Sequence, residues 1–284
     1  MPTFHWQIRD RVLDIRRPLV MGIVNVTPDS FSDGGQFYSH DSAIAHGLQL
    51  VQEGADLLDV GGESTRPGSQ PVTLEEELRR VLPVVQALAR QTSVPISIDT
   101  SKAEVARQAL EVGAHIVNDV TALQGDTAMP EIVRTFGAAA ILMHMQGKPT
   151  TMQIQPHYTD IVGEVYSFLE ARLGDLQQTG IAFEQMATDP GIGFGKTGAH
   201  NLALLANLAR FQSLKRPLCL GVSRKGFIGR ISGQPVEQRL AGSLAVVCHA
   251  AIHDAVQLVR VHDVRATRDA LLVLDALRLA PRSE

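Results

Sequence analysis

Eight short apolar runs in this chain each end in a side chain that can form hydrogen bonds or carry a proton. In chain order these residues are Asn25, Asp59, Asp99, Asn118, His144, Asp189, Ser223 and His262. Carboxylates, carboxamides, imidazoles and hydroxyls recognise the polar edges of ligands, take part in proton transfer and ligate hard cations. If the fold gathers them, the sequence therefore predicts a site for a small polar molecule.

The spacing of the eight residues predicts the elements that position them. Neighbouring members lie 19 to 45 residues apart, which leaves room for one strand and one helix in each interval. Thr73 with Glu76 matches the capping box that opens a helix. Ser101 with Glu104 matches it too. Eight such units predict an α/β fold, the closed (β/α)8 TIM barrel, rather than an open doubly wound sheet.

The chain shows no Pro/Ser-rich linker and no charge run, so we expect a single domain. Residues 18–280 form the barrel in this interpretation, and residues 1–17 form an N-terminal lead-in. TIM-barrel enzymes hold their reacting groups at the carboxyl ends of the strands, where the eight polar residues are expected. Capping of the following helix is the alternative role for each of them, and it is the favoured role for Asp59.

The composition excludes several functions. The net charge is −4 and aromatic residues make up only 5% of the chain, so it lacks the basic surface and stacking platform of a nucleic-acid-binding protein. The uncharged stretch 240–253 is too short to span a membrane. We therefore expect a cytoplasmic protein with no membrane partner. Cys219 and Cys248 lie in apolar segments and are expected to be buried thiols.

The glycine-rich stretch DPGIGFGKT at 189–197 resembles a phosphate-binding loop without matching one. Pro190 stands where a P-loop requires its first glycine, and Lys196 stands where a Rossmann turn requires its third. The stretch instead predicts a tight strand-to-helix turn that lets a flat ligand approach the backbone, with Phe194 as one wall. Glycines that serve turn geometry alone are the alternative.

Two long loops follow the first two strands, at 25–35 and 61–68. Their Gly, Pro, Ser and Asp content is typical of mobile loops, and loops of this length over a barrel mouth are often lids. They carry Asp33, Thr65 and Arg66, which are useful in catalysis. The chain has no H-x-H and no H-E-x-x-H motif, which argues against a zinc site, whereas a hard cation held by oxygens and a substrate phosphate remains an open alternative.

Seven motifs, in order and at strand ends, resemble those of the dihydropteroate synthase family, and the resemblance runs from about residue 19 to residue 278. They are NVTPDSFSDGG (25–35), GGESTRPG (61–68), SIDTSK (97–102), VNDV (117–120), DPGIGFGK (189–196), GVSRK (221–225) and RVHDV (260–264). The resemblance implies a (β/α)8 barrel, Mg²⁺ as cofactor and a homodimer formed through outer helices. It also implies condensation of 6-hydroxymethyl-7,8-dihydropterin diphosphate with p-aminobenzoate, giving 7,8-dihydropteroate and pyrophosphate.

The residue types suit the first of these substrates. A pterin presents an edge of N–H donors beside ring acceptors, and carboxylates match the donors. The resemblance assigns pterin binding to Asp99, Asn118, Asp189 and Lys225. It assigns ring packing to Met143, for which a place in the core is the alternative.

The resemblance also assigns residues to the binding of the diphosphate. Arg260 and His262 match the family's anion-binding pair, and Asn25 matches a ligand that reaches the diphosphate and Mg²⁺. For Arg260 a surface ion pair is the alternative. For His262 the alternatives are a helix cap and a place in the core.

The second substrate and the chemical step are assigned mainly to loops. The pocket for p-aminobenzoate comprises Thr65, Pro67, Phe194, Lys225 and Gly226, and the catalytic residues are Asp33, Arg66, Asp99 and Lys225. We expect the diphosphate to leave first, the loops to exclude water, and the neutral aromatic amine to attack without a strong base. Many family members carry a serine at the position of Gly226, where this chain offers only a backbone N–H at a helix start.

Two alternative functions share the fold. A pterin-binding methyltransferase barrel would share the Asp and Asn pterin readers but lack the GGESTRPG loop and the SRK lysine, both of which are present. A non-catalytic pterin- or folate-binding relative should have lost loop or pyrophosphate residues, whereas Arg66, Lys225 and Arg260 are retained. The sequence therefore favours an enzyme of the transferase class.

Overall fold

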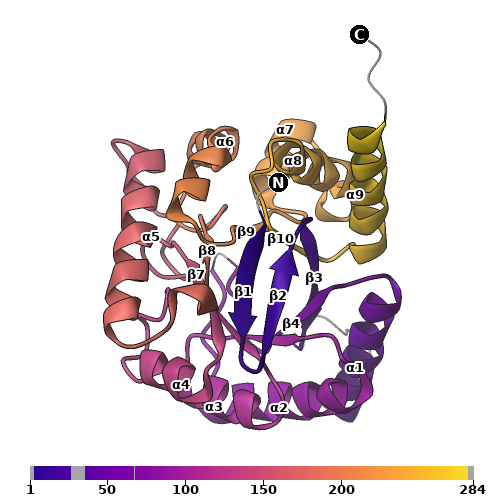
Figure 1. The fold of residues 1–284 in the computed structure, drawn as a ribbon, viewed down its shortest axis with the longest axis vertical. Coiled ribbons are helices and arrows are strands. Elements are labelled where there is room, and N and C mark those ends of the chain that lie inside the picture. Colours follow the sequence, from indigo (N-terminus) through magenta and orange to yellow (C-terminus); the bar gives the residue numbers. More distant parts are fainter. Residues whose placement is uncertain (1–2, 27–35, 67, 281–284) are drawn as a thin grey trace.

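The computed structural model of this protein describes residues 3–26, 36–66 and 68–280. Within these residues eight parallel strands form a nearly closed barrel with helices along its outside (Figure 1). The strands are β3 (Leu19–Asn25), β4 (Leu57–Gly61), β5 (Ile96–Asp99), β6 (Ile116–Asp119), β7 (Ala139–Met143), β8 (Met186–Asp189), β9 (Cys219–Gly221) and β10 (Leu258–Val261). Their order in the sheet is β8-β7-β6-β5-β4-β3-β10-β9. The predicted (β/α)8 TIM barrel is confirmed.

The two ends of this sheet meet between β8 and β9. A parallel bridge joins Thr188 to Leu218, and the Thr188 N–H donates to the Pro217 carbonyl at 2.9 Å. The surrounding α-helices are α1 (Gln36–Gln52), α2 (Leu74–Gln91), α3 (Ala103–Glu111), α4 (Met129–Phe136), α5 (Ile161–Gln178), α6 (Gly198–Ala206), α7 (Gly226–Ser232), α8 (Leu240–Ile252) and α9 (Val264–Leu279), with short 3-10 turns at Phe183–Gln185, Leu208–Leu214 and Val236–Gln238. No helix in the described part of the chain is long and apolar enough to cross a membrane.

The strands are apolar on both faces because both faces are covered. Successive residues of a strand point to opposite sides of the sheet. Met21 and Cys219 therefore face the barrel interior, whereas Val20 faces the helices. Cys248 on α8 is half-buried, so of the two thiols only Cys219 has the full burial that was expected.

The starts of α2 and α3 differ in how they are capped. Half of the predicted capping box forms at α2: the Thr73 side chain accepts from the Glu76 N–H at 3.3 Å, whereas the Glu76 carboxylate accepts from Arg79 and Arg80. The capping box predicted at Ser101 is wrong. The residue before α3 is Lys102, and the first N–H of the helix donates at 2.9 Å to a carboxylate oxygen of Asp126, which comes from a later loop. A tertiary contact thus replaces the local cap.

Residues near the N-terminus form an antiparallel hairpin of β1 (Phe4–Ile8) and β2 (Arg11–Ile15), which lies across the near end of the barrel in Figure 1. Its Trp6 and Ile15 are fully buried against the barrel interior. The Trp6 indole N–H donates to the Gln185 carbonyl at 3.0 Å, just before β8 begins. The hairpin therefore closes the amino-terminal end of the barrel, which leaves the carboxyl end of the strands for a ligand.

Candidate active site

Three of the predicted strand-end residues meet around Arg260 inside the carboxyl end of the barrel. Arg260 on β10 donates from Nη2 to Asp99 at 2.6 Å and from Nε to Asp59 at 2.5 Å. Asn118 on β6 donates from Nδ2 to the same Asp59 oxygen at 3.1 Å. The contacts form because β4, β5 and β6 are adjacent and because Asp99 lies opposite Gly61, two residues beyond Asp59. One guanidinium thus organises two buried carboxylates.

Asp59 has a different role from the one that its sequence position predicted. β4 continues past it to Gly61, so Asp59 lies within the strand, fully buried, and its expected role as a helix cap is wrong. Its Oδ2 accepts from Asn118 and Arg260, and its Oδ1 has no hydrogen-bond partner in the described part of the chain. Because Asn118 donates one side-chain N–H to Asp59, its side-chain oxygen is oriented away from Asp59 and is the group available to a ligand donor.

Two carboxylates of the site, those of Asp99 and Asp189, are buried with few hydrogen-bond donors around them in the described part of the chain. Burial raises the pKa of Asp99 to about 7, against the opposing effect of the Arg260 guanidinium. Burial also raises the pKa of Asp189, opposed first by the Lys225 ammonium and then by the Gly191 N–H, which donates at 2.7 Å. A ligand that presents several N–H groups would stabilise both anions, as expected for the donor edge of a pterin.

Lys225 lies at the start of α7 and reaches back to the glycine-rich loop. Its Nζ donates to the Ile192 carbonyl and lies 4.5 Å from the centre of the Phe194 ring. Burial lowers the pKa of Lys225 to about 8, although Asp189 acts in the opposite direction. The preceding Arg224 has a left-handed backbone with φ of +56°, a conformation that shapes the turn presenting Lys225. The Lys225 side chain and the Phe194 ring therefore lie together on the same side of the site.

Ser223 fixes the orientation of the His262 ring. The Ser223 hydroxyl oxygen accepts from the His262 backbone N–H at 3.2 Å and lies 3.0 Å from Nδ1. Because the hydroxyl engages Nδ1, Nε2 is the ring nitrogen left to face a ligand. Burial lowers the pKa of His262 to about 4, with Arg260 adding to the effect, so the ring is neutral near pH 7. His262 can offer one N–H to an anion.

The glycine-rich stretch forms the tight turn between β8 and α6 that its sequence predicted. Gly191 and Gly195 both have positive φ, of +67° and +61°. A Cβ at Gly191 would overlap the His144 carbonyl oxygen, and a Cβ at Gly195 would overlap the Gln146 carbonyl oxygen. Glycine is therefore required here by the close approach of the loop that follows β7.

The loop after β4 is held at its base. Glu63 pairs with Lys102, and Lys102 also pairs with the buried Glu77 at 2.5 Å. Beyond this anchor Thr65 is half-buried and Arg66 is exposed. Asp33, predicted to be catalytic, and Pro67, predicted to line the p-aminobenzoate pocket, lie outside the described residues, so both roles stay predictions.

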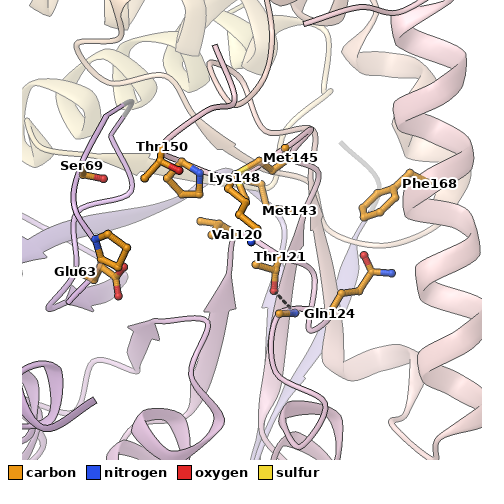
Figure 2. Close-up of a pocket in the computed structure, with 14 residues that line it drawn as sticks. Glu63, Ser69, Val120, Thr121, Gln124, Met143, Met145, Lys148, Thr150 and Phe168 are labelled. Atoms are coloured by element: carbon orange, nitrogen blue, oxygen red, sulfur yellow. Dashed lines mark hydrogen bonds between the residues drawn. The ribbon is translucent and has the colours of Figure 1, made fainter. Parts of the chain in front are cut away.

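A cavity of about 400 Å³ opens beside Met143 at the carboxyl end of the barrel (Figure 2). Its walls come from the loop after β4, the turn after β6, the loop after β7 and the side of α5. Val120, Met143 and Phe168 supply apolar surface, and Glu63 and Thr121 supply polar groups. Met143 is buried and also lines this cavity, which is compatible with ring packing and with a place in the core.

Asn25 ends β3 opposite Gly61 and is half-buried. Its side-chain oxygen is a hard donor of the kind that Mg²⁺ prefers. In the described residues no three His, Cys, Asp or Glu side chains gather where they could hold a metal ion. Mg²⁺ commonly keeps several waters and binds through one or two protein oxygens plus substrate phosphates, so the donor set here fits a Mg²⁺ bound together with a diphosphate.

The structure thus places Arg260 in direct contact with Asp99, and Asp59 joins Arg260 to Asn118. It also groups Asp189 with Lys225 and Phe194. Gly226 is exposed at the first position of α7, where a Cβ would lie 3.7 Å from an Arg230 guanidinium nitrogen. Sequence reasoning missed the part played by Lys196, which was weighed only against nucleotide-binding motifs. The signal that was available was a lysine placed among glycines in an otherwise apolar stretch.

Comparisons with known proteins agree on one family. A family model described as pterin binding enzyme matches residues 21–262. The chain is 48% identical over 264 residues, 93% of each chain, to the dihydropteroate synthase of Escherichia coli K12. It is 48% identical in sequence to the Xanthomonas albilineans dihydropteroate synthase solved with 4-aminobenzoic acid, with a TM-score of 0.92 over 99% of this chain and 100% of that chain. A Yersinia pestis dihydropteroate synthase solved with a sulfonamide drug complex aligns with a TM-score of 0.92 and 44% identity over 98% of this chain and 100% of that chain.

Proposed function

This chain belongs to the pterin-binding enzymes of the dihydropteroate synthase family, and from that membership we propose its reaction. It is a transferase that condenses 6-hydroxymethyl-7,8-dihydropterin diphosphate with p-aminobenzoate, releasing pyrophosphate and 7,8-dihydropteroate. A related Xanthomonas albilineans structure is described as a complex with 7,8-dihydropteroate, at 45% identity and a TM-score of 0.88 over 98% of this chain and 100% of that chain. The observation in this protein that carries the proposal is the buried Asp59–Arg260–Asp99–Asn118 cluster at the barrel mouth.

Recognition of the pterin is proposed for the acceptors of that mouth. Asp99 and Asp189 accept from the N–H edge of the ring, and the Asn118 carbonyl oxygen accepts a third hydrogen bond. Lys225 donates to the ring carbonyl. Because burial raises the pKa of both carboxylates, the ligand's N–H groups stabilise their charged forms.

The diphosphate is proposed to lie against Arg260 and the ring of His262, next to Asn25. Arg260 is already paired with two carboxylates, so it acts on the diphosphate from the pterin side of the site. Mg²⁺, when bound, supplies charge neutralisation to the leaving pyrophosphate. Asn25 is the residue of this chain proposed to hold it. The neutral His262 donates a hydrogen bond to a phosphate oxygen without changing the charge of the site.

The p-aminobenzoate is proposed to bind between the Phe194 ring and the loop that carries Thr65 and Arg66, with Gly226 at the floor. Its aromatic amine is neutral at pH 7 and attacks the exocyclic methylene carbon after pyrophosphate has left, and the amine loses one N–H proton as the new C–N bond forms. The Lys225 ammonium over the Phe194 ring lies at the junction of the two substrates. Exclusion of water by the loops, including Asp33 and Pro67, prevents hydrolysis of the activated pterin.

A cytoplasmic homodimer is proposed as the working form. Exposed apolar side chains concentrate on the helices at the end of the chain, including Ile231 on α7, Ile252 on α8 and Val273 and Leu277 on α9. These three helices are neighbours in Figure 1. Exposed apolar surface of this kind suits an isologous interface between two copies. Sedimentation analysis tests it, and a monomer at micromolar concentration would contradict it.

The direct test incubates the purified protein with the dihydropterin diphosphate, p-aminobenzoate and Mg²⁺, and follows pyrophosphate and dihydropteroate together. We expect equal amounts of both products, and we expect EDTA to stop the reaction and added Mg²⁺ to restore it. Pyrophosphate release that is independent of p-aminobenzoate, or no release at all, would contradict the proposed function. Full activity in EDTA would contradict only the cofactor.

A further inference from the structure

Lys196 is a buried lysine, and no carboxylate of the described residues lies within hydrogen-bonding distance of its ammonium. Its side chain is only 1% exposed, and it is among the largest fully buried side chains of the described residues. Its Nζ donates to His144 Nδ1 at 2.9 Å, to the His144 carbonyl at 3.2 Å and to the Phe194 carbonyl at 2.9 Å. These three bonds use all the donors of an ammonium group. A buried cation that meets only neutral acceptors is expensive to maintain.

His144 is a suitable acceptor for this amine because its ring is fixed and neutral. The ring packs edge-on against Phe168, with 4.9 Å between centroids and an interplanar angle of 85°. Burial lowers the pKa of His144 to about 3, so the ring is neutral, and an ammonium, which can only donate, requires the tautomer with the lone pair on Nδ1. Burial likewise lowers the pKa of Lys196 to about 7, and the charged form has the three N–H donors that its three bonds need, whereas the neutral amine has two. The pair therefore joins the loop after β7 to the loop after β8.

The bond to the Phe194 carbonyl is the one with a consequence for the site. Other bonds hold the same loop on either side: Gln153 donates to the Gly193 carbonyl at 2.7 Å, and the Tyr158 hydroxyl donates to the Gly195 carbonyl at 2.9 Å. Only Lys196 bonds the carbonyl of Phe194 itself among the described residues. The Phe194 ring lies under the Lys225 ammonium.

We propose that Lys196 is a positioning residue: with His144 it holds the Phe194 backbone so that the Phe194 ring and the Lys225 ammonium face the barrel mouth together. The inference rests on the proposed function, because that function assigns the Phe194 ring to the p-aminobenzoate side of the site and Lys225 to the junction of the two substrates. Asp99 and Asn118, by contrast, are held from β4 and β10 by Asp59 and Arg260. Loss of the Lys196 amine should therefore affect the second substrate more than the first.

Lys196→Met tests this, since methionine has a similar length and no donor. We expect the KM for p-aminobenzoate to rise about 10-fold or more and kcat to fall, while the calorimetric Kd for the dihydropterin diphosphate changes by less than about threefold. Tyr158→Phe, which removes a bond to the neighbouring Gly195 carbonyl, should change the same KM by less. Lys215→Met makes the identical exchange at an exposed site far from the mouth and should leave both constants unchanged.

His144→Phe is the second variant, because it keeps an aromatic ring against Phe168 and the backbone carbonyl that accepts from Lys196, while it removes the Nδ1 acceptor together with Nε2. It should raise the KM for p-aminobenzoate in the same direction by a smaller factor, and it decides the question if Lys196→Met does not fold. A folded Lys196→Met with an unchanged KM for p-aminobenzoate would overturn the inference. So would a parallel weakening of both substrates, which is the signature of a general structural role. An inactive wild-type protein would instead contradict the proposed function.

Discussion

Arg260 and Asp99 lie 161 residues apart in the chain and form a charge-assisted hydrogen bond of 2.6 Å at the carboxyl end of the barrel. The same guanidinium donates to Asp59 at 2.5 Å, so one cation serves two buried carboxylates. One of these carboxylates is proposed to bind the pterin, and the cation is proposed to face the diphosphate. In this proposal Arg260 couples the two ends of the first substrate, and the bond between Arg260 and Asp99 is the place to test that coupling.

Asp99→Asn should remove turnover without unfolding the protein. The carboxamide keeps the shape of the side chain but loses the charge that accepts from the pterin, and Arg260 retains its second partner, Asp59. Hydrogen bonds to charged groups contribute about 1.5–3 kcal/mol, so we expect kcat/KM to fall ~100-fold. Steady-state pyrophosphate release measures this. Glu131→Gln, which neutralises an exposed carboxylate on α4, should leave the rate unchanged, and a near-normal rate for Asp99→Asn would refute its assignment to pterin binding.

The pH dependence of kcat/KM should have a maximum between pH 7 and pH 8. Asp99 acts as a carboxylate acceptor, so activity is lost as the pH falls through its raised pKa of about 7. Lys225 acts as an ammonium donor, so activity is lost as the pH rises through its lowered pKa of about 8. Rates of the free enzyme measured from pH 5.5 to 9.5 at low substrate concentration give the profile. A flat profile across this range would contradict both roles.

The alkaline limb of that profile has two candidate groups, because burial also lowers the pKa of Lys196 to about 7. Lys225→Gln separates them. If Lys225 is the donor, the residual activity of Lys225→Gln no longer falls between pH 7.5 and 9. If the fall persists in that variant, the titrating group is Lys196 or another residue of the site.

Gly191→Ala should lower the free energy of unfolding far more than Gly137→Ala, although both glycines have a similar positive φ. Gly191 has φ of +67°, and a Cβ there would overlap the His144 carbonyl oxygen. Gly137, at the end of α4, has φ of +59° and nothing within 4 Å of a Cβ. Gly137→Ala therefore bears only the left-handed strain of about 1–2 kcal/mol. Urea denaturation should show a loss of at least ~3 kcal/mol for Gly191→Ala or no folded protein, and equal losses in the two variants would show that the backbone contact is unimportant.

The sequence was sufficient to predict the barrel and part of the site. Polar residues after apolar runs predicted strand ends at Asp99 and Asp189, and the structure ends β5 and β8 at those residues. The prediction works because parallel strands in a closed barrel bring their carboxyl ends to one side, whatever the details of packing. The strand end predicted at Asn118 is one residue too early, since β6 continues to Asp119.

The sequence was not sufficient to predict which side chains bond one another inside the mouth. The contact of Asp59 with Arg260 spans 201 residues and depends on the register of β4, which runs two residues beyond Asp59. The bond from Lys196 to His144 depends on two loops meeting backbone to backbone at Gly191. Register and loop approach are set by the packing of the whole barrel, and neither leaves a periodic pattern in one chain.

The hairpin at the start of the chain also escaped prediction, and it yields the last test. Five-residue strands that mix charged and apolar residues, such as RVLDI, do not identify their pairing partner or the barrel end that they cover. Yet Trp6 is fully buried there, and its replacement by alanine should cost ~3–5 kcal/mol of unfolding free energy. At about 2–4 °C per kcal/mol for a chain of this size, Tm should fall by ~10 °C.

The activity of Trp6→Ala distinguishes a structural closure of the barrel from a part in catalysis. Trp6 packs at the amino-terminal end of the strands, opposite the mouth where Asp99 and Asp189 lie, so kcat and both KM values of the folded variant should equal those of the wild type at 20 °C. Val12→Ala is the matched control on the same hairpin, because Val12 is 57% exposed and its truncation should change stability by no more than ~0.5 kcal/mol. Thermal denaturation followed by circular dichroism measures both variants, since Trp6 is the single tryptophan of the chain and its fluorescence is lost with it. A drop in kcat with unchanged Tm would mean that the hairpin communicates with the mouth, which no contact among the described residues suggests.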